Sequence, residues 1–232
     1  MEVTTMIYGI LCAMEEEIIS LRSHLEDRTD KEIGGISFYT GQINKHKVVL
    51  VRSGIGKVQA GMTTGLLIAE FGVTAVINSG SAGGIGQGLK IGDVVLATEV
   101  AYHDVDATAF GYEIGQLPQQ PAKYSADIDL NAAITKAAQE NNLSIKPGLI
   151  VTGDQFIASQ EQTDAILNHF PTALCSEMES AAVGQAAYQF GVPFTIVRAM
   201  SDVADEEAGQ TFDEFIIEAG QKSAKMILSL LK

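Results

Sequence analysis

The chain has 232 residues, of which 46% are hydrophobic, and it carries a formal net charge of −14. This length suits one large domain or two small ones, and we expect a single domain over residues 1–232 with a sizeable core. The negative charge, with only 15 Lys and Arg spread along the chain, excludes a surface that follows nucleic-acid phosphates and leaves small-molecule partners open.

Targeting signals are not visible either. Apolar runs stay well short of the roughly 18 residues that a membrane span needs. The N-terminus, MEVTTMIYG, lacks the basic region and cleavage pattern of a signal peptide. Cys12 and Cys175 lie far apart in apolar surroundings, as reduced, buried thiols do. We therefore expect a cytoplasmic protein without a membrane partner.

Apolar runs and helical periodicity alternate along the chain. The strands predicted from apolar, β-branched runs are residues 6–12, 47–53, 74–80, 93–101, 148–154 and 193–202. The helices predicted from apolar residues at helical spacing are residues 16–25, 58–71, 130–140, 161–170, 180–190 and 212–231. Because the strands are apolar on both faces, we expect an α/β domain whose sheet is covered by helices.

Two segments depart from this alternation. Residues 34–53 read as an antiparallel hairpin that turns at residues 44–46, which makes the expected sheet mixed rather than purely parallel. Residues 102–127 form a long irregular stretch with several aromatic residues and prolines. Loops of this length are usually functional or interfacial.

Three consecutive acids, Glu15, Glu16 and Glu17, follow the first predicted strand. Carboxylates are common in the opening turn of a helix, where free N–H groups and the helix dipole favour negative charge, so these acids need no function. Alternatively, one of them faces a ligand at the carboxyl end of the strand, where open α/β sheets place their sites.

Two glycine-rich stretches follow predicted strands but fit neither phosphate-binding motif. VRSGIGKV lacks the P-loop spacing, and in NSGSAGGIGQG the place of the third glycine of the dinucleotide fingerprint is taken by Leu89. Small residues there still let backbone amides approach a ligand. Polar residues also follow four strands, at Glu17, Gly80–Ser81, residues 154–156 and Ser201–Asp202. Together these strand ends predict one crevice without a nucleotide cofactor.

Several motifs, in order and over nearly the whole chain, resemble those of the 5′-methylthioadenosine/S-adenosylhomocysteine nucleosidases. They are AMEEE (13–17), SGIGKVQA (53–60), INSGSAGG (77–84), YHDVDATAFGYEIGQLP (102–118), GLIVTGDQFI (148–157), SEMESAA (176–182) and VRAMSDVAD (197–205). The resemblance implies the nucleoside phosphorylase-like fold, with three layers and a central mixed β-sheet flanked by helices. It also implies a homodimer without a cofactor.

The activity implied by the resemblance is hydrolysis of the N-glycosidic bond of 5′-methylthioadenosine and S-adenosylhomocysteine. The products are adenine and a 5-alkylthioribose, and the roles are methionine salvage and removal of methyltransferase by-products. Asp202 would be the general acid at nitrogen 7 of adenine, and Glu17 would accept a proton from the attacking water. Residue types alone leave open a turn-capping role for Asp202 and an exchange of roles among the three acids.

The resemblance also assigns substrate contacts. Glu179 would hold ribose hydroxyls, Ser81 and Gly83 lie in the motif next to the catalytic region, and Ser201 precedes the acid. Arg198 would fix the water and the acidic cluster, although a purely structural role is equally compatible with a buried arginine. Phe156 would stack on adenine and the backbone of Ile157 would read its edge. The 5′-thio end would be lined by Met14, Ile55, Met178 and Phe212, each of which could instead be simple core.

The long loop has two interpretations. By resemblance, residues 102–120 complete the partner's site in the homodimer, with Phe110, Tyr112 and Pro118 closing it. The polar cluster of His103, Asp104 and Asp106 in the same loop could suggest metal ligands. We expect no metal, because such short loop clusters are usually solvated or capping and the reaction needs none.

Two rival functions remain. A purine nucleoside phosphorylase would use phosphate as the nucleophile, but hexameric phosphorylases of this fold typically carry an arginine three residues before the serine, and Asn78 stands in that place. A nucleoside-binding protein without activity would have no need for both an acid and a base. Retention of Glu17, Glu179 and Asp202 together therefore favours the enzyme.

Overall fold

The computed structural model describes residues 6–205 and 207–232 and contains one mixed, ten-stranded sheet. Its strands are β1 (Ile7–Cys12), β2 (Glu26–Ile33), β3 (Ile36–Ile43), β4 (His46–Arg52), β5 (Ala75–Gly84), β6 (Val94–Tyr102), β7 (Tyr124–Ser125), β8 (Lys146–Thr152), β9 (Ala173–Glu177) and β10 (Phe194–Asp202). The helices are α1 (Glu15–Arg22), α2 (Lys57–Phe71), α3 (Ile128–Glu140), α4 (Gln160–His169), α5 (Ser180–Phe190) and α6 (Ala208–Leu230), with a short 3₁₀ turn, η1 (Thr108–Phe110).

Half of the sheet closes on itself. The strand order is β10-β6-β8-β9-β5-β1-β4-β3-β2, and β10 also pairs in parallel with β5, so that β5, β10, β6, β8 and β9 form a ring. From β5 the sheet continues as an open layer through β1 and β4 to the antiparallel hairpin β3–β4 and the edge strand β2. The ring brings the carboxyl ends of β1, β5 and β10 together, because these three strands are parallel neighbours.

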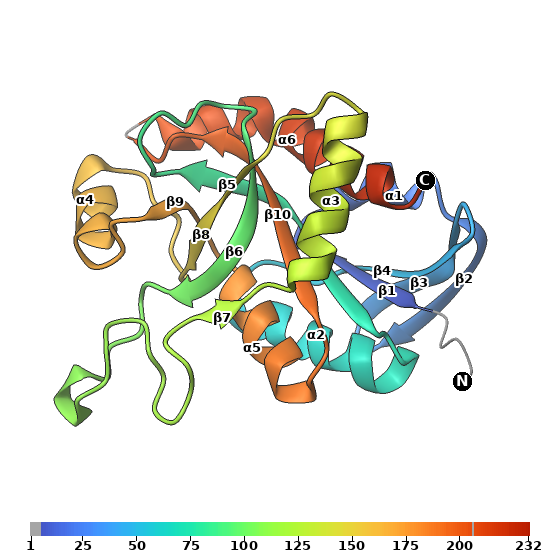
Figure 1. Cartoon of the computed structure of the whole chain (residues 1–232), viewed down its shortest axis with the longest axis horizontal. Coiled ribbons are helices and arrows are strands. Elements are labelled where there is room, and N and C mark those ends of the chain that lie inside the picture. Colours follow the sequence, from blue (N-terminus) through green and yellow to red (C-terminus); the bar gives the residue numbers. More distant parts are fainter. Residues whose placement is uncertain (1–5, 206) are drawn as a thin grey trace.

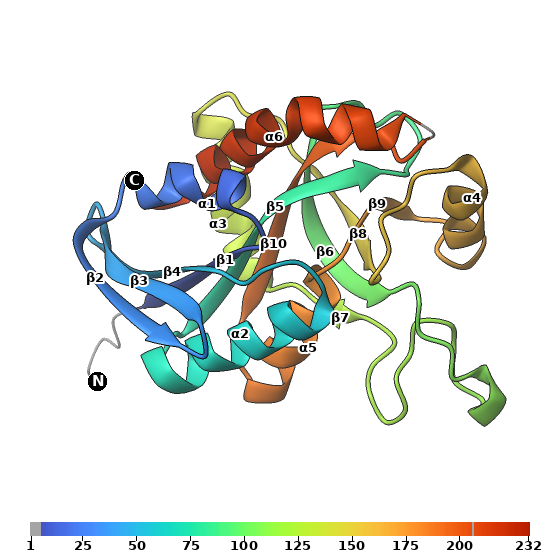
Figure 2. The ribbon, with the colours of Figure 1, turned by 180° about the vertical axis from the view of Figure 1, so that it is seen from behind.

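Helices cover both faces of the sheet, as Figure 1 and the reverse view in Figure 2 show. One face carries α1, α3 and α6, the other carries α2 and α5, and α4 lies at the end beside β8 and β9. The core divides accordingly along single strands. In β1, Leu11 packs with residues of α2 and α5, whereas Ile10 and Cys12 pack with residues of α1, α3 and α6. Successive side chains of β1 thus point to opposite faces of the sheet, and helices cover both faces. This explains why the strand is apolar at every position.

The predicted three-layer α/β fold with a mixed sheet is confirmed, and so is the hairpin at residues 34–53, which turns at Asn44 in the left-handed region (φ 54°). Both cysteines are buried and free. Within the described parts of the chain, no helix is both long enough and apolar enough to cross a bilayer.

Several predicted elements were wrong in extent or missing. Strands β2 and β9 were not predicted, because β2 (EDRTDKEI) is an exposed, charged edge strand and β9 is only five residues long. Strand β5 does not end at residue 80 but continues through the glycine-rich stretch to Gly84, where it pairs with β9 and β10. Helix α1 ends at Arg22 rather than residue 25, and α6 begins at Ala208 rather than residue 212.

Candidate active site

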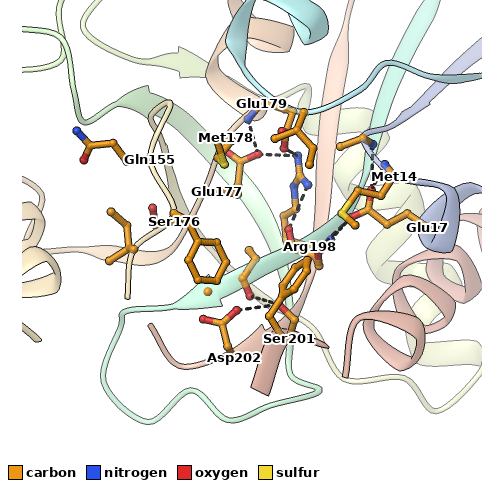
Figure 3. Close-up of a pocket in the computed structure, with 18 of the residues that line it drawn as sticks. Met14, Glu17, Gln155, Ser176, Glu177, Met178, Glu179, Arg198, Ser201 and Asp202 are labelled. Atoms are coloured by element: carbon orange, nitrogen blue, oxygen red, sulfur yellow. Dashed lines mark hydrogen bonds and ion pairs between the residues drawn. The ribbon is translucent and has the colours of Figure 1, made fainter. Parts of the chain in front are cut away.

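A cavity of about 580 Å³ opens at the carboxyl ends of β1, β5 and β10, and the segments after β8 and β9 complete its walls. Figure 3 shows Asp202 and Glu17 at different corners of this cavity. Thirteen of the predicted site residues line it: Met14, Glu17, Ile55, Ser81, Gly83, Phe156, Ile157, Met178, Glu179, Arg198, Ser201, Asp202 and Phe212.

Glu17 differs from the two acids before it because its side chain turns inward. It is the third residue of α1, and its Oε2 accepts hydrogen bonds from the N–H groups of Ala13 (2.9 Å) and Met14 (3.0 Å) across the helix start. Its Oε1 accepts from both the N–H and the Oγ–H of Ser81, each at 2.9 Å. Glu15 instead pairs with Arg22 on the surface. The local geometry of the helix start thus presents one of the three acids to the cavity.

Two glycines of β5 make room for the carboxylates. A Cβ at Gly80 would lie 2.8 Å from Oε1 of Glu17 and 2.5 Å from Nη1 of Arg198. A Cβ at Gly83 would lie 2.8 Å from Oδ1 of Asp202. Because real Cβ atoms do not approach so closely, only glycine permits both carboxylates to contact this strand. The glycine-rich stretch therefore serves close packing of acids rather than binding of a phosphate.

Asp202 ends β10 at an irregularity in its pairing with β5, between Met200 and Asp202. Such a bulge re-aims a side chain. Asp202 is 1% exposed, its Oδ1 accepts from the N–H of Ala204 (2.9 Å) and its Oδ2 accepts from the hydroxyl of Ser201 (2.9 Å). Burial raises the pKa of Asp202, and these two donors oppose the shift only in part. The residue is therefore placed to hold a proton at higher pH than an ordinary aspartate.

Arg198 is 1% exposed and lies among carboxylates and amide oxygens. Its Nη2 is 2.6 Å from Oε2 of Glu177 and 3.5 Å from Oε2 of Glu179, and it also donates to the side-chain oxygen of Asn78. Its Nη1 donates to the carbonyl of Ser81 (3.2 Å). Because every part of the guanidinium is engaged by the protein, Arg198 organises the acidic side of the cavity rather than offering a free cation.

Glu177 and Glu179 have different surroundings although they are two residues apart. Glu177 accepts from the N–H groups of Glu179 (3.0 Å) and Ser180 (2.9 Å) at the start of α5 and from the hydroxyl of Thr152, so its carboxylate is saturated by the protein. Among the described residues, Glu179 accepts only from the N–H of Gly56 (2.9 Å) besides its contact with Arg198. Burial raises the pKa of Glu179, and the nearby guanidinium opposes this shift. Glu179 thus keeps acceptor capacity for a ligand.

The other side of the cavity is apolar. The rings of Phe156 and Phe212 meet edge to face with centroids 5.7 Å apart. Phe156 is 45% exposed and Ile55 is 53% exposed, so the mouth of the cavity leaves large apolar side chains open to solvent in the single chain. A planar apolar ligand would cover part of this surface on binding.

Comparison with known proteins shows which family this chain belongs to. The model of the phosphorylase superfamily matches residues 7–232. The 5′-methylthioadenosine/S-adenosylhomocysteine nucleosidase of Staphylococcus carnosus is 48% identical over 97% of this chain and 98% of its own, and that of an Exiguobacterium strain is 50% identical over 97% of each. The chain belongs to this nucleosidase family.

Solved structures agree with this assignment to the nucleosidase family. The Neisseria meningitidis nucleosidase in complex with methylthio-immucillin-A has a TM-score of 0.96 and 46% identity, with 97% of this chain and 98% of that chain covered. A futalosine hydrolase of Helicobacter pylori has a TM-score of 0.94 at 36% identity, with 97% of each chain covered. The same backbone arrangement therefore occurs in relatives that are named for different nucleosides.

Three of the predicted site residues, all in the 102–120 loop, lie outside this cavity. Phe110, Tyr112 and Pro118 belong to the connection between β6 and β7, which extends beyond the body of the chain in Figures 1 and 2. Phe110 is 81% exposed. In the same loop, Asp104 pairs with Lys57 (2.6 Å), and the described residues contain no group of three or more candidate metal ligands.

Sequence reasoning missed part of the cavity wall. The cavity residues that had received no predicted role are Ala13, Ala82, Gln155, Ser176, Glu177, Gly209 and Asp213, of which Gln155 had been placed at the crevice. Ser176 is the most informative, because its Oγ is buried and has no hydrogen-bond partner within the described structure. It is the next-to-last residue of the unpredicted strand β9, so the pattern that would have located it, a polar residue near a strand end, was not visible. Glu177 stood in the SEMES motif but had received no role.

Proposed function

We propose that this chain hydrolyses the N-glycosidic bond of 5′-methylthioadenosine and S-adenosylhomocysteine, releasing adenine and a 5-alkylthioribose. The observation that carries the proposal is the pair of unlike carboxyl groups in one cavity. Burial raises the pKa of Asp202, whereas Glu17 receives four hydrogen bonds from N–H and O–H donors, as an acceptor-only carboxylate requires. One group suits proton donation and the other suits proton acceptance.

The acid acts on the leaving group. An adenine anion leaves poorly, so a proton must reach a ring nitrogen as the bond to the ribose breaks. We assign that proton to Asp202 and its acceptor to nitrogen 7 of adenine. The base would stack on Phe156 beside Phe212, which would bring the purine against the acid at the end of β10. Ser201 orients Asp202 through its 2.9 Å hydrogen bond.

The other residues act on the sugar and the water. As the bond breaks, the ribose becomes an oxocarbenium-like cation, and the cavity carries five carboxyl groups against one guanidinium. Ribose hydroxyls would donate to Glu179 and favour its charged form. Glu17, held by Ser81, would accept a proton from the water that attacks the anomeric carbon. The proton that Glu17 gains balances the one that Asp202 gives to adenine.

Water rather than phosphate is the nucleophile that this charge distribution favours. Arg198 is already paired with Glu177, so among the described cavity residues no basic side chain is left for a phosphate. Asn78 stands at the place of the phosphorylase arginine and is buried. Its Nδ2 donates to the carbonyl of Leu11 (3.0 Å), and its Oδ1 accepts from Arg198. An anionic nucleophile would meet five acids and no free cation.

The first prediction tests substrate, bond and nucleophile together. Purified protein incubated with 5′-methylthioadenosine in phosphate-free buffer should release free adenine at a rate that added phosphate does not increase. Adenine and the alkylthioribose are separated by chromatography. Adenine release that requires phosphate would indicate a phosphorylase, and tight binding without any adenine release would indicate a nucleoside-binding protein.

We further propose that the chain acts in the cytoplasm as a homodimer in which the 102–120 loop closes the partner's cavity. The free, buried thiols of Cys12 and Cys175 suit a reducing compartment. Exposed apolar side chains support the dimer: Ile55 at the cavity mouth, Val58 and Met62 on α2, and Phe110 on the loop. Such a surface is typical of a protein interface. The covered cavity would then exclude water from the reacting bond except for the nucleophile.

The second prediction is complementation between two defective chains. Phe110→Ala should lower kcat/KM because the partner's cavity loses its apolar cover, and Asp202→Asn should remove the acid from its own cavity. When the two variants are mixed and allowed to exchange subunits, the dimers with one chain of each kind contain one site with an intact acid and an intact loop. Adenine release should therefore exceed the sum of the two separate activities. Strict additivity would contradict the exchange of loops.

A further inference from the structure

A second hollow of about 590 Å³ lies beside the candidate active site and shares three wall residues with it, Ala13, Met14 and Ile55. It extends from this shared wall past the end of β4 and the start of α2 to the turn between β2 and β3. Its other lining residues are Gly34, Gly35, Ile36, Ser37, Tyr39, Arg52, Ser53, Gly54, Gln59 and Met62. Met14 and Ile55 are two of the residues assigned to the 5′-thio end, so the hollow continues from the point where a longer 5′ substituent would leave the active cavity.

Arg52 distinguishes this hollow chemically. The chain has four arginines, all within the described residues, and the other three have carboxylate partners: Arg22 pairs with Glu15, Arg28 with Asp30 and Arg198 with Glu177. The side chain of Arg52 makes no hydrogen bond or ion pair with the described residues and is exposed. A guanidinium presents a planar pair of donors that suits a carboxylate. The one arginine without a partner thus lines the wall of a cavity that adjoins the active site.

The backbone holds Arg52 close to the shared wall. Arg52 ends β4 in register with Cys12, the last residue of β1, and the next N–H, of Ser53, donates to the carbonyl of Cys12 (2.9 Å). Ala13 and Met14 follow directly, so the guanidinium is carried on the strand next to the 5′-thio wall. Gln59, on the first turn of α2, offers an amide oxygen that no described group occupies. The hollow therefore combines a cation with a neutral acceptor.

We propose that this second hollow binds the amino-acid end of S-adenosylhomocysteine, with Arg52 on its carboxylate and Gln59 on its ammonium group. This rests on the proposed function, since it concerns the second of the two substrates. The two substrates share adenine, ribose and sulfur and differ beyond the sulfur. Methylthioadenosine ends there in a methyl group, which stays at Met14 and Ile55. Adenosylhomocysteine continues through two methylene groups to an α-carbon with both charges. Arg52 is then a specificity-determining residue.

The third prediction uses the shorter substrate as an internal control. Arg52→Ala should raise KM for S-adenosylhomocysteine about tenfold at low ionic strength, because a charge-assisted contact is lost, and the effect should shrink as salt is added. KM for methylthioadenosine should change less than twofold. An uncharged analogue of similar length, 5′-butylthioadenosine, should also change less than twofold, which separates charge from reach. Lys146→Ala, which removes an ion-paired cation from β8 outside the hollow (2.7 Å from Asp93), serves as the control.

The outcomes separate this inference from the proposed function. An equal loss on both natural substrates would make Arg52 a structural residue, and no change on either would leave the amino-acid end to solvent or to the partner's loop; both results overturn the subsite. An increase in KM for butylthioadenosine as large as that for adenosylhomocysteine would also overturn it. If the parent protein releases no adenine from methylthioadenosine, the proposed function itself fails, whatever Arg52 does.

Discussion

Asp202→Asn is expected to lower kcat for methylthioadenosine by about 10²–10⁴-fold while the nucleoside still binds tightly, because an amide cannot deliver a proton to adenine. The amide oxygen can still accept from the N–H of Ala204, and the hydroxyl of Ser201 can turn to accept from the new NH₂ group. The cavity therefore keeps its shape. Single-turnover adenine release measures the chemical step, and calorimetric titration measures binding.

Asp205→Asn is the matched control for that variant. Asp205 lies three residues further along the same segment, outside the cavity wall, and its Oδ1 accepts from the N–H of Glu207. It should keep kcat within about threefold of the parent, since general-acid effects are confined to groups within reach of the substrate. An Asp202→Asn variant that turns over as fast as this control would show that the acid is another group.

The raised pKa of Asp202 also predicts a change in stability. A carboxyl whose pKa is raised on folding binds its proton more tightly in the folded chain, so the free energy of unfolding decreases as pH rises from its ordinary pKa of 3.8 through the raised value. Asp202→Asn removes this pH-dependent decrease in the free energy of unfolding, because asparagine does not titrate. The variant should be more stable than the parent at neutral pH, and the difference should fade below about pH 4. Denaturant titrations at both pH values measure it.

Glu17→Gln should have an equally large effect on turnover, about 10²–10⁴-fold in kcat, but with the opposite effect on stability. Both oxygens of Glu17 accept from N–H donors, of Ala13 and Met14 on one side and Ser81 on the other. An amide NH₂ would face one of these N–H groups and leave it unsatisfied, which costs about 1–3 kcal/mol. For a chain of this length we expect the Tm to fall by roughly 2–12 °C.

Glu15→Gln tests the assignment among the three acids. Glu15 is partly exposed and pairs with Arg22, so its replacement removes a surface ion pair worth about 0–1 kcal/mol and should leave kcat within about twofold. Adenine release and thermal unfolding of the two glutamine variants are compared side by side. A loss of turnover in Glu15→Gln that matches the loss in Glu17→Gln would contradict the division of roles.

Three kinds of strand show which parts of the fold the sequence pattern predicts and which it does not. The buried strands β1, β4, β6, β8 and β10 were predicted to within about two residues, because a strand with both faces covered is apolar at every position. Strand β2 was missed because its stability comes from backbone pairing with β3, which leaves no hydrophobic pattern. The glycine-rich end of β5 was placed after the predicted strand rather than within it, since glycine weakens a strand unless a close neighbour requires it, and that neighbour is an arginine distant in sequence.

For the candidate site, the sequence by itself determined which residue types gather at the ends of strands, and its ordered motifs pointed to the nucleosidase family. Only the tertiary structure decided which acid turns inward, since the orientation of Glu17 depends on Ser81, sixty-four residues away. It also decided that Arg198 forms an ion pair with Glu177 and that the side chain of Arg52 has no partner among the described residues. The physical reason is that charge, burial and hydrogen bonding act between groups adjacent in space, and strand pairing brings them together from remote parts of the chain.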